Sequence, residues 1–356
     1  MLSVAKLRRK PRHFTRLTGL TPVQFDQLER ALEPVYHAQE AARRLRPDRL
    51  RAVGGGRAFD LALGERLLAT LLYYRLYVTG TLLSYLFDLD ESNLCRERNQ
   101  RMLPALQALL PVPMQDHLLW ALEDANTNTN TNTNTSTSTS TSTNTSTNTS
   151  TNTKRPRRIG TLQELLHAHP ELQELVIDTT EQEVPKPRHK GRQKSFYSGK
   201  SHCHTLKTQV TTCGRLILHT FGGCPGSLAD ATMLKASGVL PAVSSASTSA
   251  STSASARSVR LDRGYSGIAK SYCDLPGVQL LAALKGTARL KVTLLGRLWN
   301  RVVVAPKRMQ VEQNIGHLKN WRLLAGLYRG QPQHHHPCFQ VIAGLHNLRI
   351  LETLSW

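Results

Sequence analysis

A tract with almost no apolar side chains divides this chain into two parts. Residues 125–153 alternate Asn or Ser with Thr, so neither face of the tract can be buried in a core. A chain of 356 residues is long enough for two domains. We therefore expect one domain over residues 1–124, a low-complexity linker over 125–153 and a second domain over 154–356.

A second low-complexity tract lies inside the C-terminal part. Residues 244–256 are almost pure Ser, Ala and Thr. With so little apolar surface the tract is expected to leave the domain as a surface loop, and a loop of this length costs little more entropy than a shorter one.

The N-terminal part has the sequence pattern of helices. Thr21 and Pro22 are a typical cap and first helical position, and apolar side chains follow at helical spacing. Residues 61–77 are strongly apolar but carry Glu65, Arg66 and Arg75. This predicts a buried or amphipathic helix rather than a membrane span.

Residues 81–103 have the pattern of a helix-turn-helix. A helix over 81–87, a turn at 88–90 and a second helix over 91–103 are expected. The second helix carries side chains that can reach phosphates or base edges, namely Arg96, Arg98, Asn99, Gln100 and Arg101. A plain helical hairpin with a solvated polar face fits the same pattern. Arg96, Asn99 and Gln100 are the candidate DNA-reading residues.

The C-terminal part alternates strands and helices. Strands are expected over 175–178, 205–211, 216–221, 259–262 and 278–284, and helices over 228–238, 266–275, 307–322 and 339–354. Three strands in sequence followed by strand–helix alternation predict a mixed α/β fold, in which helices flank a mixed sheet.

Three acidic residues lie where a metal site that cuts phosphodiesters needs carboxylates. Asp178 and Asp262 each end an apolar run, and Glu312 lies in a basic helical stretch. Arg308, Glu312 and Lys319 fall within a sector of about 60° on a helix that turns about 100° per residue. Carboxylates suit hard divalent cations such as Mg²⁺. Each aspartate alone also fits a turn after a strand.

These spacings resemble the DDE transposases of bacterial insertion sequences, in which the third acid lies in a pattern of Arg, three residues, Glu, six residues and Lys. Further blocks occur in family order at residues 196–200, 204–207, 226–230, 262–267 and 345–349. The resemblance covers residues 172–351 and is closest to the insertion-sequence family numbered five and its Harbinger relatives.

The resemblance implies a ribonuclease-H-like catalytic domain, with Asp178 on the first strand, Asp262 on the fourth and Glu312 on a later helix. It implies metal-dependent cleavage of element ends and transfer of the 3′-hydroxyl to target DNA. Two Mg²⁺ (or Mn²⁺) ions would be held by the three carboxylates. Phosphates would be held by Arg308, Lys319, Lys200 and Lys207, each of which also fits an ordinary exposed cation.

Two other functions remain open. Related groups often carry Tyr where this chain has Ala305, and Pro306 would break or kink a longer helix. Together with the two low-complexity tracts, these departures fit a transposase-derived DNA-binding protein with impaired or no catalysis. A metal-dependent nuclease of the same fold, acting in repair or RNA processing, is the other alternative.

The charge of the chain indicates a polyanionic partner. The net charge is +21, of which residues 1–124 carry +4 and residues 154–356 carry +17. The expected partners are element-end and target DNA and further copies of the chain in a synapsed dimer or higher oligomer. A cytoplasmic, nucleoid-associated location without membrane contact is expected. The six cysteines form no CxxC pair, so we expect reduced thiols and no zinc ribbon.

Several other polar groups admit two interpretations. The basic run over 186–194 fits contact with a DNA backbone or a solvated hairpin loop. The three histidines at 334–336 are followed by Pro337 and are expected in an exposed loop. Glu181 and Glu183 are weaker metal-site candidates. Asp230 fits a residue that orients a ligand or lysine, or an ordinary helix cap or ion pair.

Overall fold

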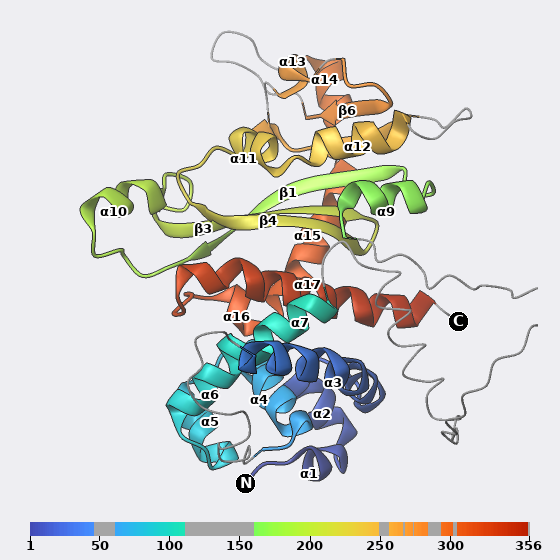
Figure 1. The fold of residues 1–356 in the computed structure, drawn as a ribbon. Coiled ribbons are helices and arrows are strands. Elements are labelled where there is room, and N and C mark those ends of the chain that lie inside the picture. Colours follow the sequence, from blue (N-terminus) through green and yellow to red (C-terminus); the bar gives the residue numbers. More distant parts are fainter. Residues whose placement is uncertain are drawn as a thin grey trace, which may run out of the picture.

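The computed structural model describes residues 1–45, 61–110, 160–248, 256–265, 268–272, 274–283, 293–301 and 305–354. The expected linker over 125–153 lies outside these residues. The described part is built in layers (Figure 1). The N-terminal helices form one layer and the long C-terminal helix lies between them and the sheet. Further helices cover the other face of the sheet.

The N-terminal part is helical, as predicted. Its elements are α1 (Val4–Arg8), α2 (Pro11–Thr18), α3 (Pro22–Arg44), α4 (Leu63–Leu76), α5 (Gly80–Phe87), α6 (Glu91–Glu97), η1 (Arg98–Met102) and α7 (Leu103–Leu109). Thr21 and Gln24 form a reciprocal capping box at the start of α3, which confirms the predicted beginning of this helix. Among the described residues, no helix is long and apolar enough to cross a membrane.

The predicted helix-turn-helix is formed by α5 and α6. Asp88 ends α5 in the left-handed conformation, with φ of 52°. The Asp90 side chain accepts hydrogen bonds from the Ser92 and Asn93 N–H groups and so caps α6. The second helix does not continue regularly to residue 103. It widens into a π-helical turn, η1, before α7 begins.

Pro104 explains this wide turn. It has no N–H to donate to the carbonyl of Gln100, four residues earlier, and its ring would crowd that carbonyl. The Leu103 N–H instead bonds the carbonyl of Arg98, five residues earlier.

The C-terminal part contains a six-stranded mixed sheet, as predicted. Its strands are β1 (Glu174–Glu183), β2 (Tyr197–Ser198), β3 (Cys203–Cys213), β4 (Leu216–Pro225), β5 (Arg257–Leu261) and β6 (Val278–Ala282). The order is β2-β3-β1-β5-β6. Strand β4 also pairs with β3, and it does so along the edge of β3 that faces away from β1. β1 is antiparallel to β3 and parallel to β5.

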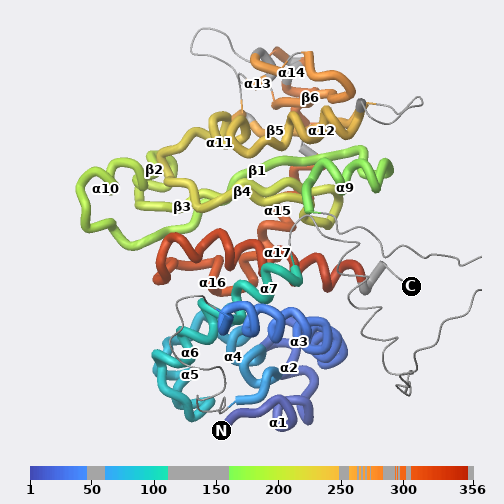
Figure 2. The backbone as a smooth tube through the Cα atoms, viewed as in Figure 1, coloured from blue at the N-terminus to red at the C-terminus, as the bar shows by residue number. Residues whose placement is uncertain are grey.

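Helices cover both faces of this sheet (Figure 2). The helices of the C-terminal part are α9 (Leu162–Ala168), α10 (Lys190–Phe196), α11 (Asp230–Ser237), α12 (Val239–Thr248), α13 (Ile268–Ser271), α14 (Leu294–Trp299), α15 (Ala305–Lys319), α16 (Arg322–Ala325) and α17 (Pro332–Leu354), of which α10 lies beyond the end of the sheet (Figure 1). Alternate residues of β1 face opposite layers. Val176 belongs to the core shared with α15 and α17, whereas Leu175 and Ile177 belong to the core shared with α9 and α12.

The expected loop over 244–256 is wrong for its first five residues. Residues 244–248 are the last part of α12, and Ala246 is buried there. Ala favours helices, and the serines find hydrogen-bond partners: Ser244 Oγ donates to the Pro276 carbonyl at 2.9 Å and Ser247 Oγ to that of Val243 at 2.8 Å. Residues 249–255 lie outside the described part.

The N-terminal helices and the C-terminal helices share one core. The buried side chains of α2, α3 and α4 belong to the same apolar cluster as those of α15, α16 and α17. The Trp321 ring lies against Gly19, where an added Cβ would come within 2.8 Å of it. The Arg75 Nη1 donates to the Asn320 carbonyl at 2.9 Å, and the rings of Tyr77 and Tyr328 stack. The two parts are therefore packed together rather than independent.

Candidate active site

Two of the three predicted carboxylates lie just past the paired residues of the parallel strands β1 and β5. Ile177 of β1 pairs with Leu261 of β5, so Asp178 and Asp262 occupy the next position on each strand. Apolar runs build both strands into the core. Asp262 directly follows the last residue of β5, whereas Asp178 lies in the middle of β1, which pairs with β3 as far as Glu183 and so runs past the strand end expected at Asp178. The sequence therefore places the two aspartates side by side at one edge of the parallel pair.

The third carboxylate, Glu312, lies on α15. Val311 and Ile315 bury one side of this helix, and the Lys307 Nζ pairs with Glu174 Oε2 at 2.6 Å at the start of β1. These contacts hold α15 beside β1. Pro306 lies in the first turn, where its missing N–H is harmless, so the expected kink does not occur.

One guanidinium joins the carboxylates. Arg308 Nη1 donates to Asp262 Oδ1 at 2.8 Å, and Arg308 Nε lies 3.0 Å from Glu312 Oε1. Burial raises the pKa of the partly buried Asp178 to about 6. The Thr179 N–H, which donates to Asp178 Oδ1 at 2.8 Å, opposes this rise, whereas the negative charges of Asp262 and Glu312 add to it. Three acids that are far apart in sequence thus converge on one place.

The three carboxylates are the type of ligand that a hard divalent cation takes, but their side chains are not arranged around one common point. Carboxylate oxygens are the ligands that Mg²⁺ and Mn²⁺ take. Among the described residues, no three His, Cys, Asp or Glu side chains are arranged so that they could hold a metal ion. Arg308 instead supplies the positive charge that Asp262 and Glu312 share.

The predicted phosphate-binding cations have different surroundings. Arg308 and Lys319 lie on the α15 face that carries Glu312, and Lys319 is exposed. Lys200 is exposed between β2 and β3. Lys207 is 8% exposed, and its Nζ donates to Asp230 Oδ1 at 3.1 Å and to the Leu228 carbonyl at 2.9 Å. Lys207 is therefore held inside the protein.

Sequence reasoning offered a lysine or an ion pair as the partner of Asp230 but did not find that Lys207 is this partner. Glu181 Oε1 lies 3.4 Å from Lys207 Nζ, so this lysine pairs with two carboxylates, those of Glu181 and Asp230. Asp230 Oδ2 also lies 2.7 Å from where a Cβ on Gly264 would stand, so a larger residue at that position would have to displace the Asp230 carboxylate. Because Gly264 is two residues after Asp262, the network supports the turn that carries this aspartate. The glycine in the Asp-Arg-Gly-Tyr block was the one signal in the sequence that another group packs closely against the turn after Asp262.

The candidate DNA-reading residues lie on α6 and η1. Arg96 and Gln100 are exposed, and Asn99 is half-buried. Two neighbouring cations serve the helical core instead: Arg98 stacks over the Tyr73 ring, and Arg101 pairs with Glu97 at 2.7 Å. Arg96 and Gln100 are therefore the side chains of the predicted five that are most free to reach a ligand.

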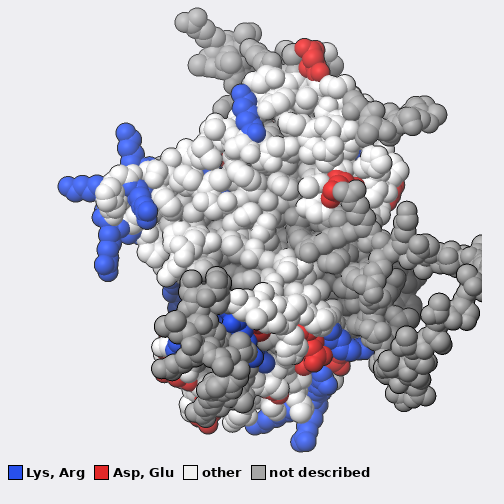
Figure 3. Space-filling model, viewed as in Figure 1, with Lys and Arg blue, Asp and Glu red and all other residues white. Residues whose placement is uncertain are grey.

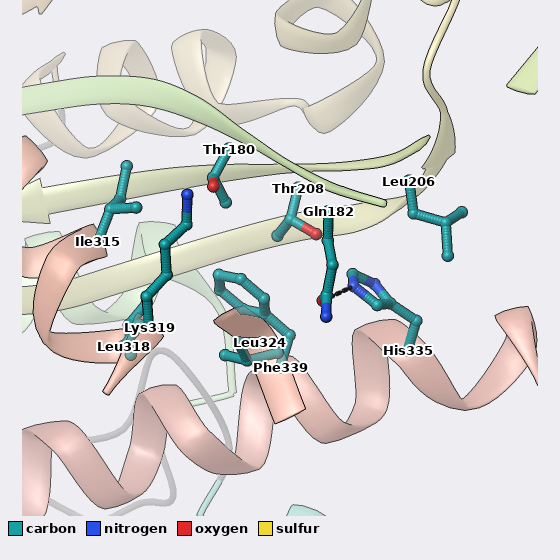
Figure 4. Close-up of a pocket in the computed structure, with 10 residues that line it drawn as sticks. All are labelled: Thr180, Gln182, Leu206, Thr208, Ile315, Leu318, Lys319, Leu324, His335 and Phe339. Atoms are coloured by element: carbon teal, nitrogen blue, oxygen red, sulfur yellow. Dashed lines mark hydrogen bonds between the residues drawn. The ribbon is translucent and has the colours of Figure 1, made fainter. Parts of the chain in front are cut away.

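The expectation of an exposed loop for the three histidines is wrong. Residues 334–336 lie in the first turns of α17, which begins at Pro332, and His335 is 1% exposed. His335 lines a cavity of about 10 Å³ between the sheet, α15 and α17, where its Nε2 hydrogen-bonds Gln182 Oε1 at 2.8 Å (Figure 4). Pro332 fits the first position of a helix. The apolar residues from Cys338 onwards are buried, and the histidines lie on the same helix, so His335 is buried with them. That space suits one water molecule and no organic substrate.

Comparison with known proteins agrees with this arrangement. Residues 177–347 match the family model described as DDE superfamily endonuclease, and they include all three carboxylates. Residues 59–111 match the model described as helix-turn-helix of DDE superfamily endonuclease, and they include α4 to α7. No curated protein and no solved structure matches. The two matches support a transposase-like endonuclease of the DDE superfamily that carries a helix-turn-helix domain.

Proposed function

We propose that this protein is a DNA transposase that cleaves the ends of its element and joins the freed 3′-hydroxyl to target DNA. The observation that carries the proposal is the convergence of Asp178, Asp262 and Glu312 around Arg308. The similarity of the sequence to the insertion-sequence family numbered five and to Harbinger transposases supports the narrower placement. A synapsed dimer or higher oligomer and a nucleoid location belong to the same proposal.

The three carboxylates would hold two Mg²⁺ or Mn²⁺ ions. When bound, such ions activate a water or a 3′-hydroxyl and stabilise the leaving oxygen of a phosphodiester. Arg308 and Lys319, on the same face of α15, would hold phosphate oxygens beside the carboxylates. No covalent bond between protein and DNA is required, so no nucleophilic Ser or Tyr is needed.

Arg308 has a second effect on this site. It pairs with Asp262 and Glu312 before any cation is bound, so a divalent ion must compete with it for the same oxygens. Once DNA is present, the guanidinium has a phosphate as an alternative partner. We expect metal and DNA to bind cooperatively for this reason.

Binding of Mn²⁺, followed by calorimetry, tests the proposal without relying on cleavage. Asp178→Asn, Asp262→Asn and Glu312→Gln should each weaken Mn²⁺ binding at least tenfold. Glu33→Gln, which removes an exposed carboxylate on α3, should leave the affinity within about twofold, because the affinity depends on ligand charge at the site. Equal affinities in all four variants would place the metal elsewhere.

The contacts of Arg308 also favour a second candidate, a transposase-derived DNA-binding protein with impaired catalysis. In that case the Arg308 guanidinium would stay paired with Asp262 and Glu312 and would take the place of a metal ion. Wild-type protein that binds duplex DNA tightly but takes up no Mn²⁺, even with DNA present, would support this candidate over the first.

A further inference from the structure

The segment between β1 and β3 forms a basic arm, which we define as residues 184–202. It contains α10 and β2 and projects beyond the end of the sheet (Figure 1). Lys and Arg side chains gather on this projection (Figure 3). The exposed cations of the arm are Lys186, Arg188, Lys190, Arg192, Lys194 and Lys200.

The charges of the arm have no acidic counterparts. The sequence contains no Asp or Glu between Glu183 and Asp230. In the part of the chain that the structure describes, none of the six arm cations forms an ion pair. Some exposed cations elsewhere do have acidic partners, such as Arg8 with Asp26 and Arg44 with Glu40. Six like charges on a short segment repel one another, so the arm favours a polyanion.

The base of the arm is fixed to the strand that carries Asp178. Glu181 of β1 accepts hydrogen bonds from Ser201 Oγ and Thr205 Oγ1, both at 3.0 Å. Burial opposes ionisation of Glu181, but these hydrogen bonds and Lys207 outweigh it and lower its pKa. Glu181 therefore stays charged and holds the start of β3 against β1.

The arm is also tied to the chain that leads into α11. The Ser227 N–H donates to the Ser195 carbonyl at 3.1 Å, and Gln193 Nε2 donates to the Pro187 carbonyl at 2.8 Å. A Cβ on Gly226 would come within 2.7 Å of the Phe196 carbonyl, so the two segments pack closely. These contacts give the basic side chains a defined position relative to β1.

We propose that the arm is a separate, sequence-independent contact for the phosphates of duplex DNA. DNA duplexes of different sequence present the same sugar–phosphate backbone, which single lysine and arginine side chains can bind without reading bases. The inference deepens the proposed function in one respect, because the DNA held by the arm is the DNA presented to the carboxylates.

The test is the salt dependence of binding by the full-length chain. The arm variant is Lys190→Gln, Arg192→Gln and Lys194→Gln together. The matched control is Arg9→Gln, Lys10→Gln and Arg12→Gln, which removes three exposed cations near the N-terminus, away from the arm. Binding of a random-sequence duplex is followed by fluorescence anisotropy over a range of salt, without divalent metal, and thermal melting checks that each variant is folded.

The arm variant should bind more weakly and lose about 2 to 3 units of the slope of log K against log salt, because each phosphate contact contributes about 0.9 unit. The control should change the slope by less than about one unit. An unchanged slope in the arm variant, or equal losses in both variants, would overturn the proposal. A larger loss for double-stranded RNA than for DNA would contradict DNA as the partner.

This outcome is independent of the catalytic proposal. Because the titration contains no divalent metal and measures no cleavage, loss of slope in the arm variant would stand even if the chain cleaved nothing. Conversely, a chain that cleaves DNA while the arm variant keeps its full slope would refute the arm contact alone.

Discussion

Arg308 allows three carboxylates to lie together in a partly buried place. Asp178, Asp262 and Glu312 would repel one another, and part of that repulsion is visible in the raised pKa of Asp178. The guanidinium offsets it by contacting two of the three. The positive charge of Arg308 thus lies where a divalent metal ion would also offset the repulsion between the carboxylates.

His335 is a buried residue whose protonation should destabilise the protein. Burial lowers the pKa of His335 to about 4, and the nearby His336 adds to this effect. Its Nε2 hydrogen-bonds Gln182, its Nδ1 is buried without a hydrogen bond, and the rings of Tyr328 and Phe339 lie beside it. The unfolded state, with an ordinary pKa near 6.5, therefore binds more protons between pH 6.5 and 4.

Stability should accordingly be complete above about pH 6.5 and should fall as the pH drops towards 4. His335→Gln keeps a donor for Gln182 but cannot be protonated. Its free energy of unfolding, measured with urea, should fall less steeply than that of wild type by up to about 1.4 kcal/mol per pH unit. His334→Gln, at the more exposed neighbouring position, is the control for replacing a histidine in this turn of α17. Parallel pH profiles for wild type and His335→Gln would contradict the account.

At the scale of elements, local sequence signals predicted most of the fold. The Thr21–Pro22 start of α3, the turn at residues 88–90 before α6 and the apolar runs of β1 and β5 are all local, so the sequence located these elements. The π-helical turn before Pro104 and the helical half of 244–256 were missed. The first depends on one missing N–H within a good helical pattern, and the second on burial against residues distant in sequence.

Helix α6 and its extension η1 should carry sequence recognition. We predict that Arg96→Ala with Gln100→Ala reduces the preference for a duplex selected by the wild-type chain from a random pool, relative to a scrambled duplex. Each lost base contact should cost about 1 to 3 kcal/mol of discrimination. Competition binding measures this preference, with Arg9→Ala plus Lys10→Ala as the control. Loss of affinity for both duplexes in equal proportion would show that these side chains contact only phosphates.

At the scale of the whole molecule, the N-terminal helices pack with the C-terminal helices in one shared core. Trp321 shows why the sequence could not reveal this, because its contact with Gly19 joins residues about 300 positions apart. The candidate site shows the same limit. The motif spacing predicted the three carboxylates, but the contact of Arg308 with Asp262 and the pairing of Lys207 with Glu181 and Asp230 depend on how α15, β3 and α11 pack.

The shared core predicts one cooperative unfolding transition. Trp321→Ala should destabilise the chain by about 3 to 5 kcal/mol and lower the protection of α4 and β3 together in hydrogen exchange. Deletion of residues 125–153 should change the free energy of unfolding by only about 1 kcal/mol, because the tract has almost no apolar side chains to bury. Separate unfolding of α4 and β3 after Trp321→Ala, or a lost transition after the deletion, would refute this view.

The central claim is that Asp178, Asp262 and Glu312 form one metal-dependent site that cuts DNA. Its most direct test is cleavage of the selected duplex with Mg²⁺ by wild type and by Asp178→Ala, Asp262→Ala and Glu312→Ala. Because metal ligands act as a unit, each variant should lose cleavage by at least about a thousandfold while keeping most of its affinity for the duplex. Cleavage by Glu312→Ala at nearly the wild-type rate, under the same Mg²⁺ concentration, would contradict the assignment of the site.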